Sequence, residues 1–341
     1  MQVFFDTTQN HHEPKSYFTR GQMRDPQELP RRTTALLSGV EAAGLAVEAP
    51  RDFGMGPIAA VHDLGYLRFL ESAHRRWTSG PQDWGNEVMS NVFVRSPNPL
   101  RGILAEAARY QADGSSPIGA GTWQAAYASA QSAIAAADAL ANGARAAYGL
   151  CRPPGHHARR DAAGGFCYLN NAAIAAEWLR GQGFSRVAIL DPDMHHGQGI
   201  QEIFYDRADV LYISIHADPT NFYPVVTGFE DERGIGNGEG ANINLPMPHG
   251  SAGSVFFDLM DQALKGIRLF DADVLILPLG FDIYRNDPQS QVDVDSDGFE
   301  QIGRLVHGMG LPTVIIQEGG YDVDNLAWNC KSFLDGFLNS K

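Results

Sequence analysis

Short runs of β-branched and apolar residues alternate along the chain with longer segments whose apolar positions have helical spacing. This alternation is typical of a mostly parallel sheet with helices on both faces. The runs predicted as strands are Gln2–Phe5, Ala147–Cys151, Arg186–Asp191, Val210–His216, Val274–Gly280 and Thr313–Gln317. The predicted helices are Thr122–Asn142, Asn171–Gly181, Ser254–Leu269, Ser296–Gly308 and Val323–Leu338. The pattern therefore predicts an α/β protein built on one central, mostly parallel sheet.

Two regions interrupt the alternation. Trp77–Leu100 is rich in Ser, Gly, Pro and Asn with aromatic residues between them, and it is predicted as a long ordered insertion. Phe229–Asn242 is Gly-rich and charged, which predicts a surface loop. Long loops of compact domains often carry function or mediate association. Because the pattern is otherwise even over all 341 residues, we expect a single domain, 1–341, in preference to two.

Composition narrows the classes of partner and location. The net charge of −14 argues against nucleic acid, because phosphate binding needs a basic face. An acidic surface attracts cationic ligands, although solubility alone explains the charge equally well. No apolar run approaches the roughly 18 residues of a membrane span, so no membrane association is expected. The start of the chain, Met1–Asp6, lacks the basic and apolar regions of a secretory signal.

Cysteine usage points to a reducing compartment. Cys151, Cys167 and Cys330 form an odd set without the spacing of a disulfide framework, so we expect reduced thiols in a cytoplasmic protein. Cys151 and Cys167 flank a pair of histidines, which leaves metal ligation as an alternative. That alternative is disfavoured because each lies in apolar sequence without a CxxC partner.

A candidate metal site follows two predicted strands. The segment Asp191-Pro-Asp193-Met-His195-His196-Gly197 comes directly after one strand, and Asp282 follows another. Since ligands bind beyond the carboxyl ends of parallel strands, Asp193, His195 and Asp282 are expected to meet at one sheet edge. Two carboxylates and an imidazole suit a divalent cation, and three protein ligands leave a position for water. The alternative for Asp282 is a loop carboxylate that caps a turn.

The paired histidines His156 and His157 follow two prolines and a glycine, which hold the backbone in one place. Beside a metal, such a pair supplies a general base and a general acid. Asp191 is the expected partner of His156, and Gln198 the expected partner of His157; an amide partner leaves its histidine less basic. Alone, the pair would more often be structural, and the neighbouring motifs favour the catalytic interpretation.

Aromatic side chains supply the remaining candidate groups. Tyr321 ends the segment Glu318-Gly-Gly-Tyr321, where the glycines permit a tight turn, and its hydroxyl could stabilise a developing oxyanion. Phe166, which follows Gly165, and Tyr223 lie in loops and could wall a narrow apolar channel. The alternative for each of these rings is a packed aromatic in the core.

Together, the motifs RPPGHH, GFCYLNN, DPDMHHGQG, LGFD and EGGY resemble those of the zinc-dependent deacetylases in the arginase/deacetylase superfamily. The resemblance runs from His62-Asp63 to Tyr321 and implies the arginase/deacetylase fold. It implies one Zn²⁺ on Asp193, His195 and Asp282, catalysis by His156, His157 and Tyr321, and tunnel walls at Gly165, Phe166 and Tyr223. It also implies structural K⁺ near Asp191, Asp193, His195, Ser214 and Ile215, and a second K⁺ near Phe204, Arg207 and Val210.

Within the superfamily, two-manganese ureohydrolase chemistry is not expected, because Tyr284 and Gly197 stand where further acidic ligands would be needed. The length, the start of the chain and the Trp77–Leu100 insertion resemble the bacterial acetylpolyamine amidohydrolases. That resemblance implies a homodimer built by the insertion and a narrowed active-site mouth. Gln198 departs from the Asn or Asp of many relatives. Glu106 and Asp113 are candidates for binding a distal substrate ammonium.

The expected activity is hydrolysis of the acetyl amide of small cationic N-acetylated polyamines, such as acetylputrescine or acetylcadaverine, to the free amine and acetate. The alternative is a protein acetyl-lysine deacetylase with the same machinery and a more open mouth. An acyl amide or hydroxamate outside the polyamines is also left open. A non-catalytic binder of acetylated ligands is disfavoured, because every metal and catalytic position is filled.

Overall fold

The computed structural model describes residues 1–94 and 99–339, and its centre is a parallel sheet of eight strands. In spatial order these are β4 (Val47–Glu48), β1 (Gln2–Phe4), β5 (Ala146–Gly149), β12 (Thr313–Gln317), β10 (Val274–Leu279), β6 (Val187–Asp191), β7 (Val210–Ala217) and β8 (Asn242–Met247). Each neighbouring pair runs parallel. Small pairings outside this sheet join β2 (Tyr17–Thr19) to β3 (Gln22–Arg24) and β9 (Ser251–Ala252) to β11 (Val292–Asp293).

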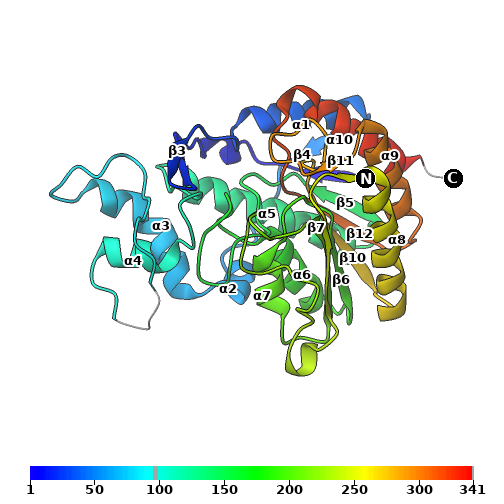
Figure 1. The fold of residues 1–341 in the computed structure, drawn as a ribbon. Helices are drawn as coiled ribbons and strands as arrows, with labels where there is room; N and C mark the ends of the chain where they lie inside the picture. The colour runs from blue at the N-terminus through cyan, green and yellow to red at the C-terminus, as the bar shows by residue number, and fades with distance from the viewer. Residues whose placement is uncertain (95–98, 340–341) are drawn as a thin grey trace.

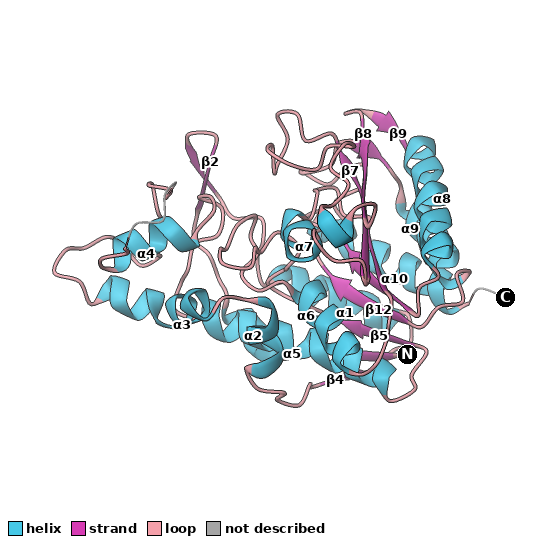
Figure 2. Cartoon of the chain, turned by 90° about the horizontal axis from the view of Figure 1, so that it is seen from below, coloured by secondary structure: helices cyan, strands magenta, loops and turns pink. Residues whose placement is uncertain are grey.

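Helices cover both faces of the sheet (Figures 1 and 2). On one face, the helices in contact with the strands are α5 (Thr122–Ala141), α6 (Asn171–Gly181) and α7 (Gln198–Phe204). The same hydrophobic core continues outward into α2 (Gly56–Val61), α3 (Leu64–Thr78) and α4 (Ile103–Tyr110). The other face packs against α1 (Arg31–Ala42), α8 (Gly253–Phe270), α9 (Ser296–His307) and α10 (Val323–Leu338). Short 3₁₀ turns span Thr7–His11 and Gly236–Gly238. No helix among the described residues is long and apolar enough to cross a membrane.

The central strands are buried along their whole length, which explains their apolar sequence. In β6, Val187 and Ile189 face one core while Ala188 and Leu190 face the other. A parallel strand covered on both sides has no polar face, so it appears in sequence as a continuous apolar run. The predicted single α/β domain with a parallel sheet is confirmed.

All six predicted strands are present, with small errors at their ends. Ala147–Cys151 was placed too late, since β5 ends at Gly149 where the chain leaves the sheet, and Val274–Gly280 was one residue too long. Among the helices, Asn171–Gly181 and Val323–Leu338 match, and the other three differ by one residue at one or both ends. The helices before α5 and the edge strands β4 and β8 were not predicted.

The insertion begins later than predicted. Trp77 belongs to the last turn of α3, and its side chain is buried against the core around α3. Residues 95–98 of the predicted insertion lie outside the described part of the chain. In Figures 1 and 2, α3 and α4 form a projection on the side of the molecule away from α8. The predicted loop Phe229–Asn242 contains a 3₁₀ turn and gives way to β8 at Asn242.

A buried ionic network joins the loops at the carboxyl edge of the sheet. Oε1 of Glu28 accepts hydrogen bonds from Arg32 at 3.0 Å and from Arg152 at 2.8 Å, and all three side chains are buried. Arg32 also donates to the backbone oxygens of Glu318 and Gly320, each at 2.6 Å. Although burial opposes ionisation, Arg152 and Arg32 hold the pKa of Glu28 below its usual range. The network therefore fixes the Glu318–Tyr321 turn against the loop that starts at Arg152.

We expect Glu28→Gln to lower the free energy of unfolding by about 3–5 kcal/mol, because it leaves two guanidinium groups buried without a counter-charge. Glu13→Gln is the matched control, since Glu13 pairs with Lys15 at 3.0 Å with both side chains more than 60% exposed, at 63% and 68%. That exposed pair should contribute no more than about 1 kcal/mol. Denaturant unfolding of both variants measures the difference, and equal losses would contradict the importance of the network.

Candidate metal centre

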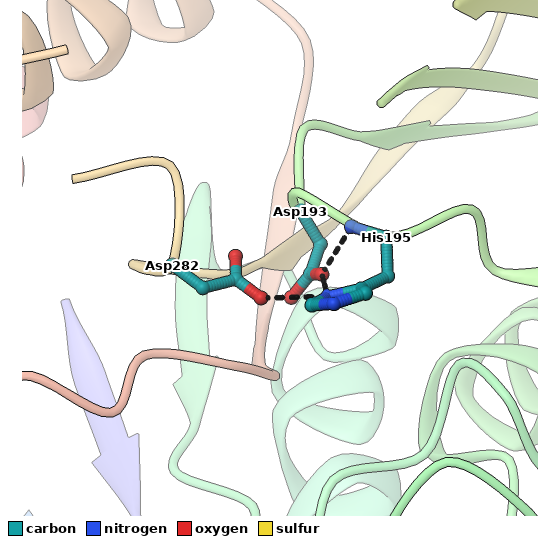
Figure 3. A group of neighbouring side chains, drawn as sticks. All are labelled: Asp193, His195 and Asp282. Atoms are coloured by element: carbon teal, nitrogen blue, oxygen red, sulfur yellow. Dashed lines mark hydrogen bonds and ion pairs between the residues drawn. The ribbon is translucent and has the colours of Figure 1, made fainter. Parts of the chain in front are cut away.

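Three candidate ligands meet at the carboxyl edge of the sheet. Asp193 and His195 follow β6, and Asp282 follows β10, the strand beside it. The ligand atoms of Asp193, His195 and Asp282 all lie within 4.8 Å of one another, and the three residues are buried. Figure 3 shows the two carboxylates and the imidazole turned toward a common point. The cluster is the one that the strand-end positions predicted.

Backbone contacts hold the carboxylates in place. Oδ1 of Asp193 accepts from the His195 amide at 2.9 Å, and Oδ1 of Asp282 accepts from the Met194 amide at 2.9 Å. Two glycines allow this approach: a Cβ on Gly280 would lie 2.0 Å from Oδ2 of Asp193, and one on Gly319 would lie 2.5 Å from Oδ2 of Asp282. The backbone therefore leaves no room for any side chain larger than hydrogen beside the carboxylates.

The donor set fits a divalent cation. Nδ1 of His195 lies 3.0 Å from Oδ2 of Asp282 and 3.3 Å from Oδ1 of Asp193. Burial, followed by the charge of Asp193, raises the pKa of Asp282 to about 7. Two carboxylates buried side by side repel each other, and a dication bound between them would offset both charges. Two hard oxygen donors with one imidazole suit Zn²⁺ or a similar ion.

The paired histidines lie beside this cluster with their rings 3.9 Å apart. Nδ1 of His156 is 3.1 Å from Oδ2 of Asp191, and Nδ1 of His157 is 2.6 Å from Oε1 of Gln198. Burial lowers the pKa of His156, but the carboxylates of Asp193 and Asp191 outweigh it and raise that pKa above its usual range. Burial and the neighbouring His156 lower the pKa of His157. The two imidazoles therefore differ in the protonation state that their surroundings favour.

Aromatic side chains surround the histidines. The ring of Tyr223 lies 4.8 Å from that of His157, and Phe166 lies 5.8 Å from Tyr321. Gly165 has φ +57°, and a Cβ there would come within 2.3 Å of His157. The Tyr321 amide donates to Asp287 at 2.6 Å, which holds the tyrosine at its turn. The structure thus brings Gly165 and Tyr223 to His157 and places Phe166 beside Tyr321.

The two candidate ammonium ligands have different surroundings. Glu106 lies on α4, where both of its oxygens receive hydrogen bonds from Arg76, at 2.5 and 2.6 Å. Asp113 lies beside Tyr223 and Gly165, where Oδ2 accepts from the hydroxyl of Tyr223 at 2.7 Å and from the Gly165 amide at 3.2 Å. The structure therefore brings Asp113 to the aromatic wall and shows Glu106 in an ion pair of its own.

The residues predicted to bind structural potassium lie in two separate places. Asp191 and Ser214 are paired across β6 and β7, and Ile215 follows on β7. Near the end of α7, the amide of Arg207 donates to the oxygen of Phe204 at 3.0 Å, and Val210 begins β7. Occupation of either position by K⁺ stays a prediction.

Several contacts at the centre were not predicted from sequence. The ring of Phe222 stacks on His195 with centroids 4.9 Å apart, and the hydroxyl of Tyr212 donates to Asp191 at 2.9 Å. Asp287 and Arg32 hold the turn that carries Tyr321. Phe222 could have been suspected from its place beside Tyr223. The others carried no sequence signal, since each is an ordinary residue type outside any motif.

The parallel sheet, the Asp–His–Asp cluster and the adjacent histidine pair define a metal-dependent hydrolase of the arginase/deacetylase superfamily. The model of the histone deacetylase domain matches residues 26–337. The chain belongs to the histone deacetylase family. The three free cysteines are buried, and none is part of the cluster of possible ligands found among the described residues.

Relatives match along the whole chain. A protein of Burkholderia pseudomallei (strain 1710b), named acetylpolyamine amidohydrolase, is 62% identical over 337 residues, which is 99% of this chain and 98% of the relative. Acetylpolyamine amidohydrolase 1 of Pseudomonas aeruginosa is 43% identical, over 96% of this chain and 95% of that protein.

Solved structures agree with the fold. The crystal structure of an acetylpolyamine aminohydrolase from Burkholderia pseudomallei superposes with a TM-score of 0.97 at 62% identity, covering 99% of this chain and 98% of that one. The HDA15 HD domain gives a TM-score of 0.81 at 26% identity, covering 100% of this chain and 90% of that domain.

We expect Asp282→Ala to abolish stoichiometric binding of a divalent metal, because one of three ligands and one of two balancing charges are lost. Asp271→Ala is the matched control, since its side chain is 83% exposed and lies outside the cluster. Metal analysis after dialysis should find about one ion per chain in the wild type and the control, and almost none in Asp282→Ala. Retention of a full equivalent would show that the ligand set is wrong.

Proposed function

We propose that this protein is a zinc-dependent amidohydrolase that releases acetate from small N-acetylated polyamines of the acetylputrescine or acetylcadaverine type. The observation that carries the proposal is the buried Asp193–His195–Asp282 cluster beside the histidine pair. It occurs in a chain 62% identical over 99% of its length to a relative named acetylpolyamine amidohydrolase. The net charge of −14 suits a cationic substrate.

Zinc held by Asp193, His195 and Asp282 would polarise the amide carbonyl and lower the pKa of the attacking water. His157, whose partner is an amide and whose pKa is lowered, is suited to accept the proton of that water at Nε2. The histidine pair then returns a proton to the nitrogen of the leaving amine, which departs as the carbon–nitrogen bond breaks.

Tyr321 supplies a hydrogen-bond donor to the carbonyl oxygen as negative charge develops there. Burial raises the pKa of its phenol well above the usual value, so the hydroxyl keeps its proton at neutral pH. Loss of one such donor typically costs about 10²–10³ in rate. The guanidinium of Arg32 lies 4.9 Å from the centroid of the Tyr321 ring and helps to hold it.

The positions of Phe166 and Tyr223 are evidence for a narrow apolar passage to the metal centre. Phe166 has φ +69° and stands edge-on to Tyr17 and to Tyr321, at 5.2 and 5.8 Å between centroids. Aromatic walls grip an alkyl chain without hydrogen-bond demands. A passage of this kind suits the linear methylene chain of an acetylated diamine.

The alternative activity is deacetylation of acetyl-lysine in proteins. The likeness to the HDA15 HD domain supports a shared fold, but at 26% identity. Relatives named acetylpolyamine amidohydrolase match at 62% and 43% over at least 95% of both chains, which favours the small substrate.

The remaining expectations belong to the same proposal. A homodimer built on the projection is supported by exposed apolar side chains there, including Val92, Phe93 and Leu104, which are 42–61% exposed. Structural K⁺ near Ser214 and near Arg207 is expected from the resemblance to the deacetylases. A cytoplasmic location is supported by three buried cysteines that form no disulfide.

The test compares N-acetylputrescine with an acetyl-lysine peptide, using zinc-loaded protein with and without a chelator. We expect strong, chelator-sensitive turnover of N-acetylputrescine and little turnover of the peptide. The reason is that the proposed passage admits a methylene chain and excludes a protein backbone. Preference for the peptide would overturn the substrate assignment and leave the metal chemistry in place. Turnover that survives complete removal of metal would overturn the mechanism.

We expect Gly165→Ala to lower kcat/KM for N-acetylputrescine by at least about tenfold, since the new Cβ would lie 2.3 Å from His157 and 2.8 Å from Tyr223. Gly236→Ala is the matched control, because Gly236 has nearly the same φ of +56° with nothing within 4 Å of the added carbon. The control should share the backbone strain and keep full activity. Equal effects of the two substitutions would mean that strain alone is responsible.

A further inference from the structure

A continuous chain of hydrogen bonds runs from the wall of the passage to one catalytic histidine. Nδ1 of His157 lies 2.6 Å from Oε1 of Gln198, and Nε2 of Gln198 lies 3.0 Å from the hydroxyl oxygen of Tyr223. That hydroxyl is in turn 2.7 Å from Oδ2 of Asp113. The three contacts connect residues that are between 25 and 110 positions apart in sequence.

The carboxylate of Asp113 determines which group donates and which accepts in each of these hydrogen bonds. Oδ1 accepts from the amide and hydroxyl of Ser115, at 2.8 and 2.5 Å, while Oδ2 accepts from Gly165 at 3.2 Å and from Tyr223. An ionised carboxylate is an acceptor only, and four donors fill about four lone-pair sites. The hydroxyl of Tyr223 must therefore donate its proton to Asp113.

With its proton committed, the Tyr223 oxygen can only accept from Gln198. The amide of Gln198 must then present its NH₂ group to Tyr223 and its carbonyl oxygen to His157. A carbonyl oxygen can be paired only with a donor, so Nδ1 of His157 carries the proton. The remaining ring nitrogen, Nε2, keeps its lone pair.

We propose that the hydroxyl of Tyr223, anchored by Asp113, fixes the orientation of the Gln198 amide and thereby keeps His157 as the Nδ1–H tautomer with Nε2 free. The inference rests on the proposed role of His157 in amide hydrolysis. In addition to forming the wall of the proposed passage, Tyr223 and Asp113 are then positioning residues for the Gln198 amide.

Glutamine makes this anchor necessary. The two ends of an amide have nearly the same shape, so rotation by 180° would place NH₂ against Nδ1 of His157. The imidazole would then adopt the Nε2–H tautomer and lose its proton acceptor on the side of the metal centre. A carboxylate at position 198 accepts through either oxygen and would need no anchor, and this difference supplies a test.

Tyr223→Phe removes the hydroxyl and keeps the ring that forms the wall. We expect kcat to fall roughly three- to tenfold with little change in KM. The reason is that loss of one ordinary hydrogen bond shifts the populations of the two Gln198 orientations by about this factor. In the Gln198→Glu background the same substitution should change kcat less than about twofold, because the carboxylate cannot present a donor. Tyr127→Phe is the matched control, since it removes a tyrosine–aspartate bond to Asp52 on the surface.

A spectroscopic readout separates this inference from the proposed substrate. Nitrogen NMR of metal-loaded protein labelled in histidine, with the His157 signal assigned by His157→Gln, reports which ring nitrogen carries the proton. The wild type and Tyr127→Phe should show the Nδ1–H form, and Tyr223→Phe should show a large share of the Nε2–H form. Failure to hydrolyse acetylpolyamines with this tautomer change intact would refute only the proposed substrate. An unchanged tautomer in Tyr223→Phe, or equal losses of kcat in both backgrounds, would overturn the inference.

Discussion

The structure depends on offsetting the repulsion among carboxylates that are buried together at one edge of the sheet. Asp191, Asp193, Asp282 and Glu318 are all fully buried there. Burial raises the pKa of Glu318 to about 7, and its Oε2 accepts from the amides of Gly155 and His156. Buried charge is tolerated only when paired or bound to metal. Imidazoles and backbone amides compensate part of this charge, and a divalent cation bound by Asp193, His195 and Asp282 would compensate the rest.

The same requirement explains the loops around the centre. The carboxylates of Asp193 and Asp282 fit against the backbone at Gly280 and Gly319 only because these two residues lack a side chain. Arg32 holds the turn that carries Tyr321 by donating hydrogen bonds to the backbone oxygens of Glu318 and Gly320. The charge of Arg32 is balanced by Glu28. A buried arginine supplies several donors in fixed directions, which suits it to hold two turns at once. Rigid support of this kind keeps reacting groups within the tolerance that catalysis requires.

In the proposed mechanism, the substrate passage and the proton transfer are connected through Tyr223. Its ring lies 4.8 Å from that of His157, and its hydroxyl links Asp113 to the Gln198 amide that faces His157. If the proposal holds, a substitution at Tyr223 alters the protonation pattern of His157 as well as the shape of the passage. Substrate selection and proton transfer would then share residues, because Gln198, unlike a carboxylate, needs an orienting partner.

The sequence by itself determined the sheet and the meeting of the three candidate metal ligands, because strands covered on both faces appear as continuous apolar runs and their carboxyl ends must share one edge. It could not predict the edge strand β8, whose Asn242 and Asn244 are polar yet buried. Nor could it predict the pairing of Glu28 with Arg152 or the place of Asp113. Those contacts join positions more than 100 residues apart, so only the tertiary packing decided which donors each carboxylate would meet.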